Sequence, residues 1–318
     1  MNNVKAGHKN KQSYSNTRTT GKEQYYTNSE VVDLCMSAVL KHIDLTGKTL
    51  LEPCGGTGEF IKGFQRSGVE DKDIISYDIE PKHPLVKLGN YLETDFSQHK
   101  DLVCITNPPF GRNHSLSKRF FAHSAEHCEY ICFLIPKSWR KWSLQNSLND
   151  DFHLIEDIEM PKNCFYLPDG TTKEKDVLNT VFQIWQRKPY KRKKISVIDH
   201  GLIKKIIPVQ KITKTTKTLN KRGEVVLKHT KRPDYVVGAN FEMIIFGHSC
   251  GKTKRISAPR VDAKTTTLYL QIEREDVKQA LEEIDFSEFY NNVAYVQALS
   301  LQEINYKLNQ HFSLKLLE

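Results

Sequence analysis

Short apolar runs alternate with helical patterns through the first part of this sequence, and this alternation limits the fold more than any other feature. The runs predict buried strands because they are short, apolar and bounded by polar turns. Strands that alternate with helices predict a mostly parallel sheet covered on both faces. The predicted helices follow residue 58 as EFIKGFQRS and also comprise 116–127 and 138–148. The seven predicted strands comprise 49–53, 73–79, the end of 87–96, 101–107, 130–136, 152–160 and 179–186.

The sequence divides into three predicted regions. Residues 1–22 contain almost no apolar side chains and predict a flexible basic arm. Residues 23–190 contain the alternating pattern and predict an α/β domain. Residues 191–318 predict a basic linker followed by a smaller α+β C-terminal region, which ends in two amphipathic helices at 276–284 and 299–312.

The net charge of +9 is distributed unevenly along the chain. Residues 187–232 contain 16 Lys or Arg against two acids, and residues 1–22 add five basic residues and no acid. The rest of the chain therefore carries a net charge of −10. Basic segments attached to an acidic body favour a polyanionic partner, of which the phosphate backbone of nucleic acid is the common case. A solvated, lysine-rich linker is the alternative for 187–232.

Composition and cysteine usage exclude several classes of protein. No apolar run approaches the roughly 20 residues that span a bilayer, and the first residues lack the apolar core of a secretory signal, so we expect a cytoplasmic or nuclear protein. Seven cysteines without CxxC pairing argue against a disulfide framework and against a zinc module. The cluster His123, His127, Cys128 and Cys132 is expected to pack without a metal, because Cys132 falls inside the next strand.

A glycine-rich turn, LEPCGGTGEF, joins the first predicted strand to a helix. Gly55, Gly56 and Gly58 allow a tight turn and let a ligand approach the main chain at the helix N-terminus. Similar turns bind dinucleotides, but GGTGEF departs from the GxGxxG spacing. Glu52 also precedes the glycines, where a carboxylate repels a pyrophosphate and accepts a hydrogen bond from an ammonium group.

Two further acids are predicted at the ends of the next two strands. Asp78 ends the second strand, 20 residues after Gly58, where a carboxylate can bind both hydroxyls of a ribose. Asp95 and Phe96 are expected to end the third strand and to hydrogen-bond and stack on an adenine. Acids at successive strand ends line one crevice, because the carboxyl ends of parallel strands meet at the same edge of a sheet.

These residues resemble the S-adenosylmethionine-dependent methyltransferases. TNPPF, residues 106–110, is similar to the (Asp/Asn/Ser)-Pro-Pro-(Tyr/Phe/Trp) motif of amino-methyltransferases, especially those that act on N6 of adenine. KEQYYTNSEVVDLCM, residues 22–36, resembles the cofactor-capping motif of the gamma-type DNA adenine methyltransferases. The resemblance covers residues 22–187 and implies a Rossmann-like, doubly wound sheet with S-adenosyl-L-methionine as the cofactor. The cofactor-binding residues implied are Tyr26, Thr27, Glu52, Pro53, Cys54, Gly55, Gly56, Gly58, Asp78, Ile79, Asp95 and Phe96.

The NPPF motif suits methylation of an exocyclic amino group, which is a poor nucleophile because its lone pair is delocalised into the ring. The Asn107 side-chain oxygen and the Pro108 carbonyl are expected to accept the two amino hydrogens and to turn the lone pair toward the methyl group. Pro109 helps to fix the direction of that carbonyl, and Phe110 is expected to stack on the base. The reaction is then a direct in-line displacement, and duplex DNA must flip its base into the pocket.

Two other motifs admit alternatives. In KSWRKWS, Lys137, Trp139, Arg140 and Lys141 predict phosphate contact and base stacking, although tryptophans that pack under a helix fit equally well. Pro53-Cys54 resembles the nucleophile of cytosine-C5 methyltransferases, but it lies at the glycine turn, so we interpret Cys54 as structural.

The resemblance favours DNA as the substrate, as does the separate C-terminal region within 191–318, which we expect to recognise the substrate. Three alternatives remain open. An RNA adenine-N6 methyltransferase is the first, and an enzyme that methylates a glutamine side chain in a protein is the second. The third is a non-catalytic, nucleic-acid-binding scaffold with a methyltransferase-like fold. The sequence leaves the oligomeric state, the recognition sequence, the presence of a cognate nuclease and the role of residues 187–232 open.

Overall fold

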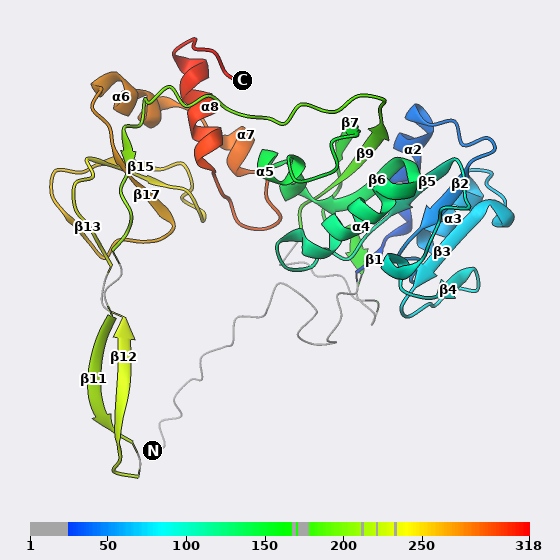
Figure 1. Cartoon of the computed structure of the whole chain (residues 1–318), viewed down its shortest axis with the longest axis horizontal. Coiled ribbons are helices and arrows are strands. Elements are labelled where there is room, and N and C mark those ends of the chain that lie inside the picture. Colours follow the sequence, from blue (N-terminus) through cyan, green and yellow to red (C-terminus); the bar gives the residue numbers. More distant parts are fainter. Residues whose placement is uncertain (1–24, 167–169, 171–177, 211–212, 221, 232–233) are drawn as a thin grey trace, which may run out of the picture. The chain divides into compact units, whose positions relative to one another are not determined.

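The computed structural model describes residues 25–166, 170, 178–210, 213–220, 222–231 and 234–318 (Figure 1). The predicted flexible arm, residues 1–22, lies outside this range. The chain divides into two compact units, which we describe separately. The first is drawn from Met1–Trp139 and Ser143–Lys193, and the second from Arg140–Trp142 and Lys194–Glu318.

The first unit is built around a seven-stranded sheet. Its strand order is β4-β3-β2-β5-β6-β9-β7, and every strand is parallel to its neighbours except β9, which runs antiparallel to both β6 and β7. The predicted mostly parallel, doubly wound sheet is therefore confirmed. The strands are β2 (Thr49–Glu52), β3 (Ile74–Asp78), β4 (Val86–Leu88), β5 (Leu102–Thr106), β6 (Cys128–Pro136), β7 (Phe152–Glu159) and β9 (Thr180–Arg187).

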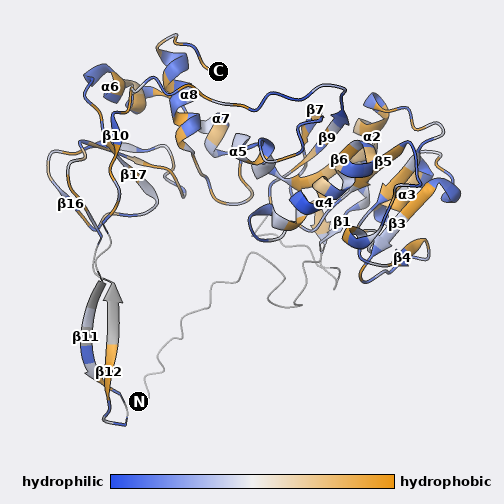
Figure 2. Cartoon of the chain, in the orientation of Figure 1, coloured by the Kyte–Doolittle hydropathy of each residue, from blue (hydrophilic) through white to orange (hydrophobic). Residues whose placement is uncertain are grey.

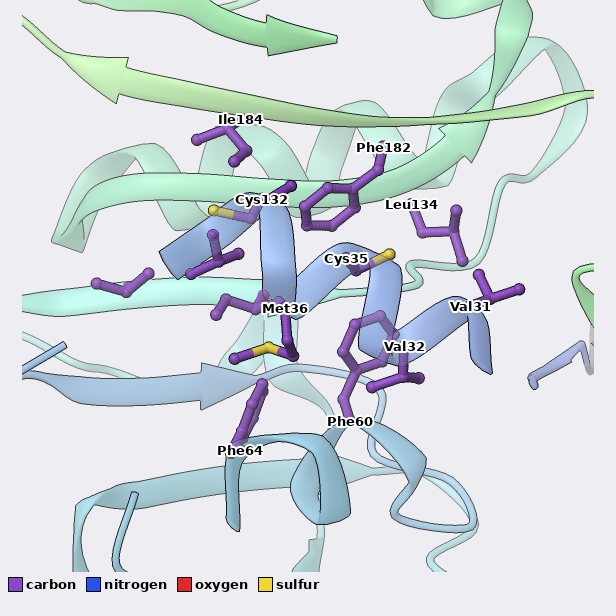
Figure 3. Packing of buried hydrophobic residues seen from close by; sticks show 14 of the residues in the cluster. Val31, Val32, Cys35, Met36, Phe60, Phe64, Cys132, Leu134, Phe182 and Ile184 are labelled. Carbon is purple, nitrogen blue, oxygen red and sulfur yellow. The ribbon is translucent and has the colours of Figure 1, made fainter. Parts of the chain in front are cut away.

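Helices cover both faces of this sheet, because its inner strands are apolar on both sides. On one face, α2 (Ser29–His42) and α3 (Glu59–Arg66) place Met36 and Phe64 in a buried cluster with Cys132 and Phe182 (Figure 3). On the other face, α4 (Ser115–His127) contributes Phe121 to a second cluster that contains alternate residues of the same strands. Alternate side chains of a strand point to opposite faces of the sheet, so each inner strand contributes to both clusters.

The third strand differs from the prediction. It is the short edge strand β4, at the start of residues 87–96 rather than at their end, and a 3-10 helix, Tyr91–Glu93, follows it. The strand was predicted at the end of this segment because Tyr91 and Phe96 are apolar. These side chains are instead buried beneath α4, where the Tyr91 hydroxyl forms a hydrogen bond with Ser124 Oγ at 2.8 Å. The helix predicted at 138–148 is also reduced, to the 3-10 helix Lys137–Arg140 and to α5 (Trp142–Gln145).

A two-stranded sheet completes the first unit. It pairs β1 (Tyr26–Thr27) with β8 (Phe165–Tyr166) and thereby joins residues that are almost 140 positions apart in the sequence. The chain enters α2 directly from β1, and the Asn28 amide donates to the Cys164 carbonyl at 2.9 Å. This small sheet fixes the segment just before α2.

The second unit contains an antiparallel four-stranded sheet in the order β10-β17-β14-β15, and its core includes residues of the two predicted C-terminal helices. Among the described helices of the chain, none is long and apolar enough to cross a membrane. The elements of this unit are β10 (Lys205–Ile206), β11 (Thr213–Leu219), β12 (Val225–Lys231), β13 (Tyr235–Val236), β14 (Phe241–Ile244), β15 (Thr253–Arg255), β16 (Arg260–Val261), β17 (Thr267–Gln271), α6 (Glu275–Glu283), α7 (Ser287–Tyr290) and α8 (Leu301–His311).

Candidate active site

The strand order of the large sheet reverses at β2 and β5. From β2 the chain adds β3 and β4 on one side, and it then returns to build β5 and β6 on the other side. Ligands of open α/β sheets bind at such a switch point, outside the carboxyl ends of the strands. Glu52 ends β2, Asp78 ends β3 and Asn107 follows β5, so these three predicted site residues lie along one edge of the sheet.

Glu52 is a buried carboxyl group at this edge, and its side chain is linked to the neighbouring strand. It is 1% exposed, and its Oε1 accepts hydrogen bonds from Thr106 Oγ1 at 2.5 Å and from the Cys54 amide at 3.1 Å. Its Oε2 is buried and has no hydrogen-bond partner among the described residues. Burial raises the pKa of Glu52 to about 8; the two hydrogen bonds oppose this rise, and the negative charge of Asp78 adds to it.

The glycine turn packs too closely for side chains at two positions. A Cβ on Gly55 would lie 2.3 Å from Ser76 Oγ and 2.6 Å from Val86 Cγ2, and one on Gly58 would lie 2.5 Å from the ring of His83. Gly58 also has a φ of 81° and directly precedes α3. The turn therefore needs glycine for contact with the protein itself as well as for conformation.

Asp78 and Tyr26 both contact the glycine turn at Gly56. Asp78 Oδ2 accepts from the Gly56 amide at 2.9 Å, and its Oδ1 accepts from the Glu80 amide at 2.8 Å. A carboxylate retains further lone pairs, so these bonds orient Asp78 and leave it able to accept hydroxyl donors. The Tyr26 ring lies beside Gly56, and its hydroxyl accepts from Lys82 Nζ at 2.7 Å.

Asn107 has a defined amide orientation. Its Nδ2 donates to the Tyr25 carbonyl at 3.0 Å and to Thr27 Oγ1 at 3.3 Å, so both amide hydrogens have acceptors. Its Oδ1 is buried and has no hydrogen-bond partner among the described residues. The reverse orientation would place the oxygen against a carbonyl, so the contacts select the one in which an acceptor is left over.

The rest of the NPPF motif forms a packed turn. Pro108 is buried and Pro109 is half-buried, and Phe110 is 6% exposed. The Phe110 ring lies against Tyr25, with centroids 6.2 Å apart and planes 25° from parallel, and against Phe165 at 6.4 Å. Tyr25 thus stacks on the Phe110 ring, whereas Phe165 meets it edge-on.

Three residues with positive φ follow the motif and bring the chain into α4. They are Gly111 at 68°, Asn113 at 53° and His114 at 61°. His114 Nε2 bonds Ser138 Oγ at 2.9 Å, which ties this turn to the end of β6. Burial, together with the charge of Lys118, lowers the pKa of His114.

Asp95 and Phe96 do not end a strand, and their predicted contact with an adenine has no support. The ring of Phe96 is 2% exposed and packs against Tyr77 and Tyr91 in the core. Asp95 is exposed and accepts two hydrogen bonds from Ser97, which keep the pKa of Asp95 below its usual 3.8. Ile79, directly after Asp78, is by contrast 62% exposed and remains open to a ligand.

The predicted substrate-binding residues at 137–141 are divided between the two units. Trp139 is fully buried against Phe121 and Phe133, as in the packing alternative, so it is not open to a base. Lys137 is ion-paired with Glu159 at 2.8 Å. Arg140 and Lys141 belong to the second unit. There, Lys141 Nζ pairs with Glu303 at 2.8 Å and also donates hydrogen bonds to two backbone carbonyls.

The histidine cluster and the cysteine of the glycine turn have structural contacts. His123 Nε2 lies 3.0 Å from the Thr94 carbonyl, and both His123 and His127 pack edge-on against Phe96. Donor atoms of these two histidines and Glu126 lie within 4.8 Å of one another. Burial raises the pKa of the Cys54 thiol well above its usual range, with the charge of Glu52 adding to the rise, so Cys54 is a poor nucleophile. Pro53 links it to Glu52.

Sequence reasoning missed the residues of β8 and the role of Tyr25. Phe165 packs on Phe110 and Tyr25, and the Tyr166 hydroxyl lies 3.1 Å from Thr57 Oγ1 in the glycine turn. No local pattern distinguishes these aromatic residues, because their partners are more than 50 residues away. The sequence did contain one signal for these contacts, the two adjacent tyrosines of QYYT. Two large aromatic side chains just before a helix need other side chains to pack against.

Comparisons with known proteins give matches only among solved structures. No protein-family model and no curated protein matches the chain. One solved match is a Pyrococcus horikoshii protein whose description suggests an RNA methyltransferase, with 15% identity, a TM-score of 0.41 and coverage of 52% of this chain and 87% of that one. Another is the methyltransferase subunit of a type I restriction-modification system from Streptococcus thermophilus, with 14% identity, a TM-score of 0.39 and coverage of 52% and 45%.

A third solved match is a Listeria monocytogenes protein whose description suggests a class I S-adenosylmethionine-dependent methyltransferase. It has 14% identity and a TM-score of 0.38, and the match covers 53% of this chain and 63% of that one. The chain thus spans less than two thirds of the Streptococcus and Listeria proteins. All three descriptions name methyltransferases.

Proposed function

We propose that the chain transfers a methyl group from S-adenosyl-L-methionine to the N6 amino group of adenine in DNA. The observation that carries this proposal is the unpartnered Oδ1 of Asn107. It is a buried acceptor at the switch point of an α/β sheet, held there by two hydrogen bonds from its own amide nitrogen. A buried acceptor without a donor costs about 1–3 kcal/mol, which a ligand amino group removes.

The chain's own residues fit the methyl donor at a second unpartnered atom. Glu52 Oε2 is buried at the end of the neighbouring strand, where it is suited to an ammonium group. Asp78 has lone pairs free for ribose hydroxyls, and Ile79 offers an exposed apolar side chain beside it. S-adenosyl-L-methionine, when bound, supplies an electrophilic methyl group on a sulfonium. We also assign the glycine turn, where the Tyr26 ring lies beside Gly56, to binding of this cofactor.

Asn107 and Pro108 then orient the acceptor base. The Asn107 oxygen takes one amino hydrogen and the Pro108 carbonyl takes the other, which directs the nitrogen lone pair out of the plane of the ring. Pro109 stiffens the turn and adds no competing donor. Phe110 supports the base from one face, and this requires the Tyr25 ring to move from its stacked position when the flipped base enters.

The test measures transfer of labelled methyl groups to four polymers: duplex DNA, single-stranded DNA, structured RNA and protein. We expect N6-methyladenine in DNA, identified by mass spectrometry of the nucleosides. Asn107→Ala should lower kcat/KM by about 10²–10³-fold, the usual loss for one preorganised hydrogen-bonding group. Asn291→Ala, which alters an exposed asparagine of the second unit, is the matched control.

Each remaining result contradicts the proposal in a different way. Label in RNA alone assigns the activity to RNA, and label in a glutamine side chain assigns it to protein. Retention of full activity by Asn107→Ala would remove the proposed role of the amide oxygen. Binding of nucleic acid without transfer to any polymer would identify a scaffold.

A further inference from the structure

The strands β11 and β12 form a separate two-stranded ribbon in the second unit. They pair antiparallel from Thr213 opposite Lys231 to Leu219 opposite Val225, and in the described part of the chain they pair only with each other. Beside the turn, Asn220 Oδ1 accepts from the Arg222 and Glu224 amides at 2.9 and 3.0 Å. An isolated ribbon is marginally stable in water, so it gains from a surface that binds it.

Four apolar side chains near the turn of the ribbon are uncovered. Leu219 is 69% exposed, Val225 66% and Leu227 60%, and Val226 on the other face is 40% exposed. Opposed and alternate residues of a ribbon share a face, so Leu219, Val225 and Leu227 lie together with Lys217. Figure 2 shows this as hydrophobic colour on β12 beside the turn, next to hydrophilic colour on β11.

The ribbon is also strongly basic. Between Thr213 and Lys231 the sequence has six Lys or Arg and one acid, Glu224. The carboxylate of Glu224 accepts from Asn220 Nδ2 at 2.7 Å within the turn. Lys217 and Arg222 are exposed beside the apolar face. A surface that combines positive charge with small apolar contacts complements a polyanion that has apolar groups between its phosphates.

We propose that this ribbon enters the major groove of duplex DNA. The groove, about 12 Å wide, admits a two-stranded ribbon, and the methyl group of thymine presents an apolar contact there. Lys217 and Arg222 bind phosphates, and the face with Leu219, Val225 and Leu227 lies against base edges. The assignment rests on the proposed function for its choice of DNA, and it adds the element that holds the duplex.

The test measures the affinity of the full chain for a fluorescent 20-base-pair duplex by anisotropy over a series of salt concentrations. Lys217→Gln with Arg222→Gln should reduce the slope of log affinity against log salt by about 1.8, since each phosphate contact contributes about 0.9. Arg66→Gln with Lys72→Gln, a matched pair of exposed charges in the first unit, should leave the slope unchanged.

The apolar face is tested separately. Leu219→Ser with Leu227→Ser should weaken binding several-fold and leave the salt slope as it was, because no phosphate contact is lost. A duplex with uracil in place of thymine should weaken binding of the unaltered chain, and it should have little further effect on the serine variant. Thermal unfolding of each variant checks that the second unit remains folded.

The outcomes separate this inference from the proposed function. If the unaltered chain binds thymine and uracil duplexes equally, or if the Lys217 and Arg222 variant keeps the full salt slope, the ribbon does not enter the groove, whatever the enzyme methylates. A loss of slope on structured RNA and none on duplex DNA would assign the ribbon to RNA and overturn the inference. A chain that transfers no methyl group still reports duplex binding, because anisotropy needs no catalysis.

Discussion

The carboxyl group of Glu52 predicts how the stability of the protein changes with pH. The unfolded chain exposes this group, which then has its ordinary pKa of 4.5, whereas burial raises the pKa of Glu52 in the folded chain to about 8. Between these two values the folded state keeps a proton that the unfolded state releases. The free energy of unfolding therefore falls as pH rises through this window, by about 1.4 kcal/mol per pH unit and by about 4–5 kcal/mol in total.

Glu52→Gln removes this dependence and preserves the contacts of the protonated acid. The glutamine oxygen still accepts from Thr106 Oγ1 and from the Cys54 amide, and the amide nitrogen takes the place of the unpartnered Oε2. We expect the variant to be close to the parent in stability at pH 5 and several kcal/mol more stable at pH 8.5. The groups that face Glu52, including Asp78, are common to both proteins, so the difference isolates this carboxyl group.

Urea unfolding of the ligand-free protein at pH 5, 6, 7 and 8.5 measures the effect. Glu93→Gln, which removes an exposed carboxylate from the same unit, controls for the loss of a negative charge. If parent and Glu52→Gln curves run parallel over the whole range, Glu52 is ionised in the folded protein, and the argument from burial is wrong.

Two further predictions concern single hydrogen-bonded side chains. Thr27→Val removes one of the two acceptors that orient Asn107, so kcat/KM should fall about fivefold, as expected for one neutral hydrogen bond. Equal activity of the variant would show that Thr27 does not position the amide. Lys141→Met leaves Glu303, which is 3% exposed, without its cation and should destabilise the second unit by about 3–5 kcal/mol in urea unfolding. Lys204→Met, from an exposed pair, should cost less than about 1 kcal/mol, and a similar loss in both variants would contradict the argument.

The inner strands could be predicted from the sequence because both of their faces are buried. DLVCITN and YICFLIP are almost uninterrupted apolar runs, and the structure buries every residue of β5 and all but one of β6. The edge strand β4 could not be located this way, since only Val86 of its three residues is buried and Leu88 is 75% exposed. Tyr91 and Phe96 gave a stronger apolar pattern than β4 did, but these side chains are buried because they pack under α4.

The site could be predicted only as far as local sequence determines it. Glu52, Asp78 and Asn107 follow from strand ends, because a parallel sheet brings those ends together. The surroundings of KSWRKW could not be predicted from local sequence, since Lys137 and Lys141 pair with acids far along the chain, Glu159 and Glu303. The position of Tyr25 depends on a strand pair with residues almost 140 positions away, and no local pattern encodes such a pairing.

Four buried side-chain atoms in the described part of the first unit lack a hydrogen-bond partner, and two of them, Glu52 Oε2 and Asn107 Oδ1, are best understood together. Glu52 Oε2 and Asn107 Oδ1 lie at the ends of adjacent strands, and Thr106, the last residue of β5, bonds Glu52 from between them. Folded proteins bury few polar atoms without a partner, so two at one switch point indicate that stability is given up there for binding. The two atoms also differ in kind: the Glu52 carboxyl group, which is protonated in the free protein below about pH 8, accepts from a cation once it ionises, and the neutral amide oxygen of Asn107 is suited to a neutral amino group. Ligands that supply one donor of each kind would satisfy both atoms at once, and exchanging the two residue types would remove that match.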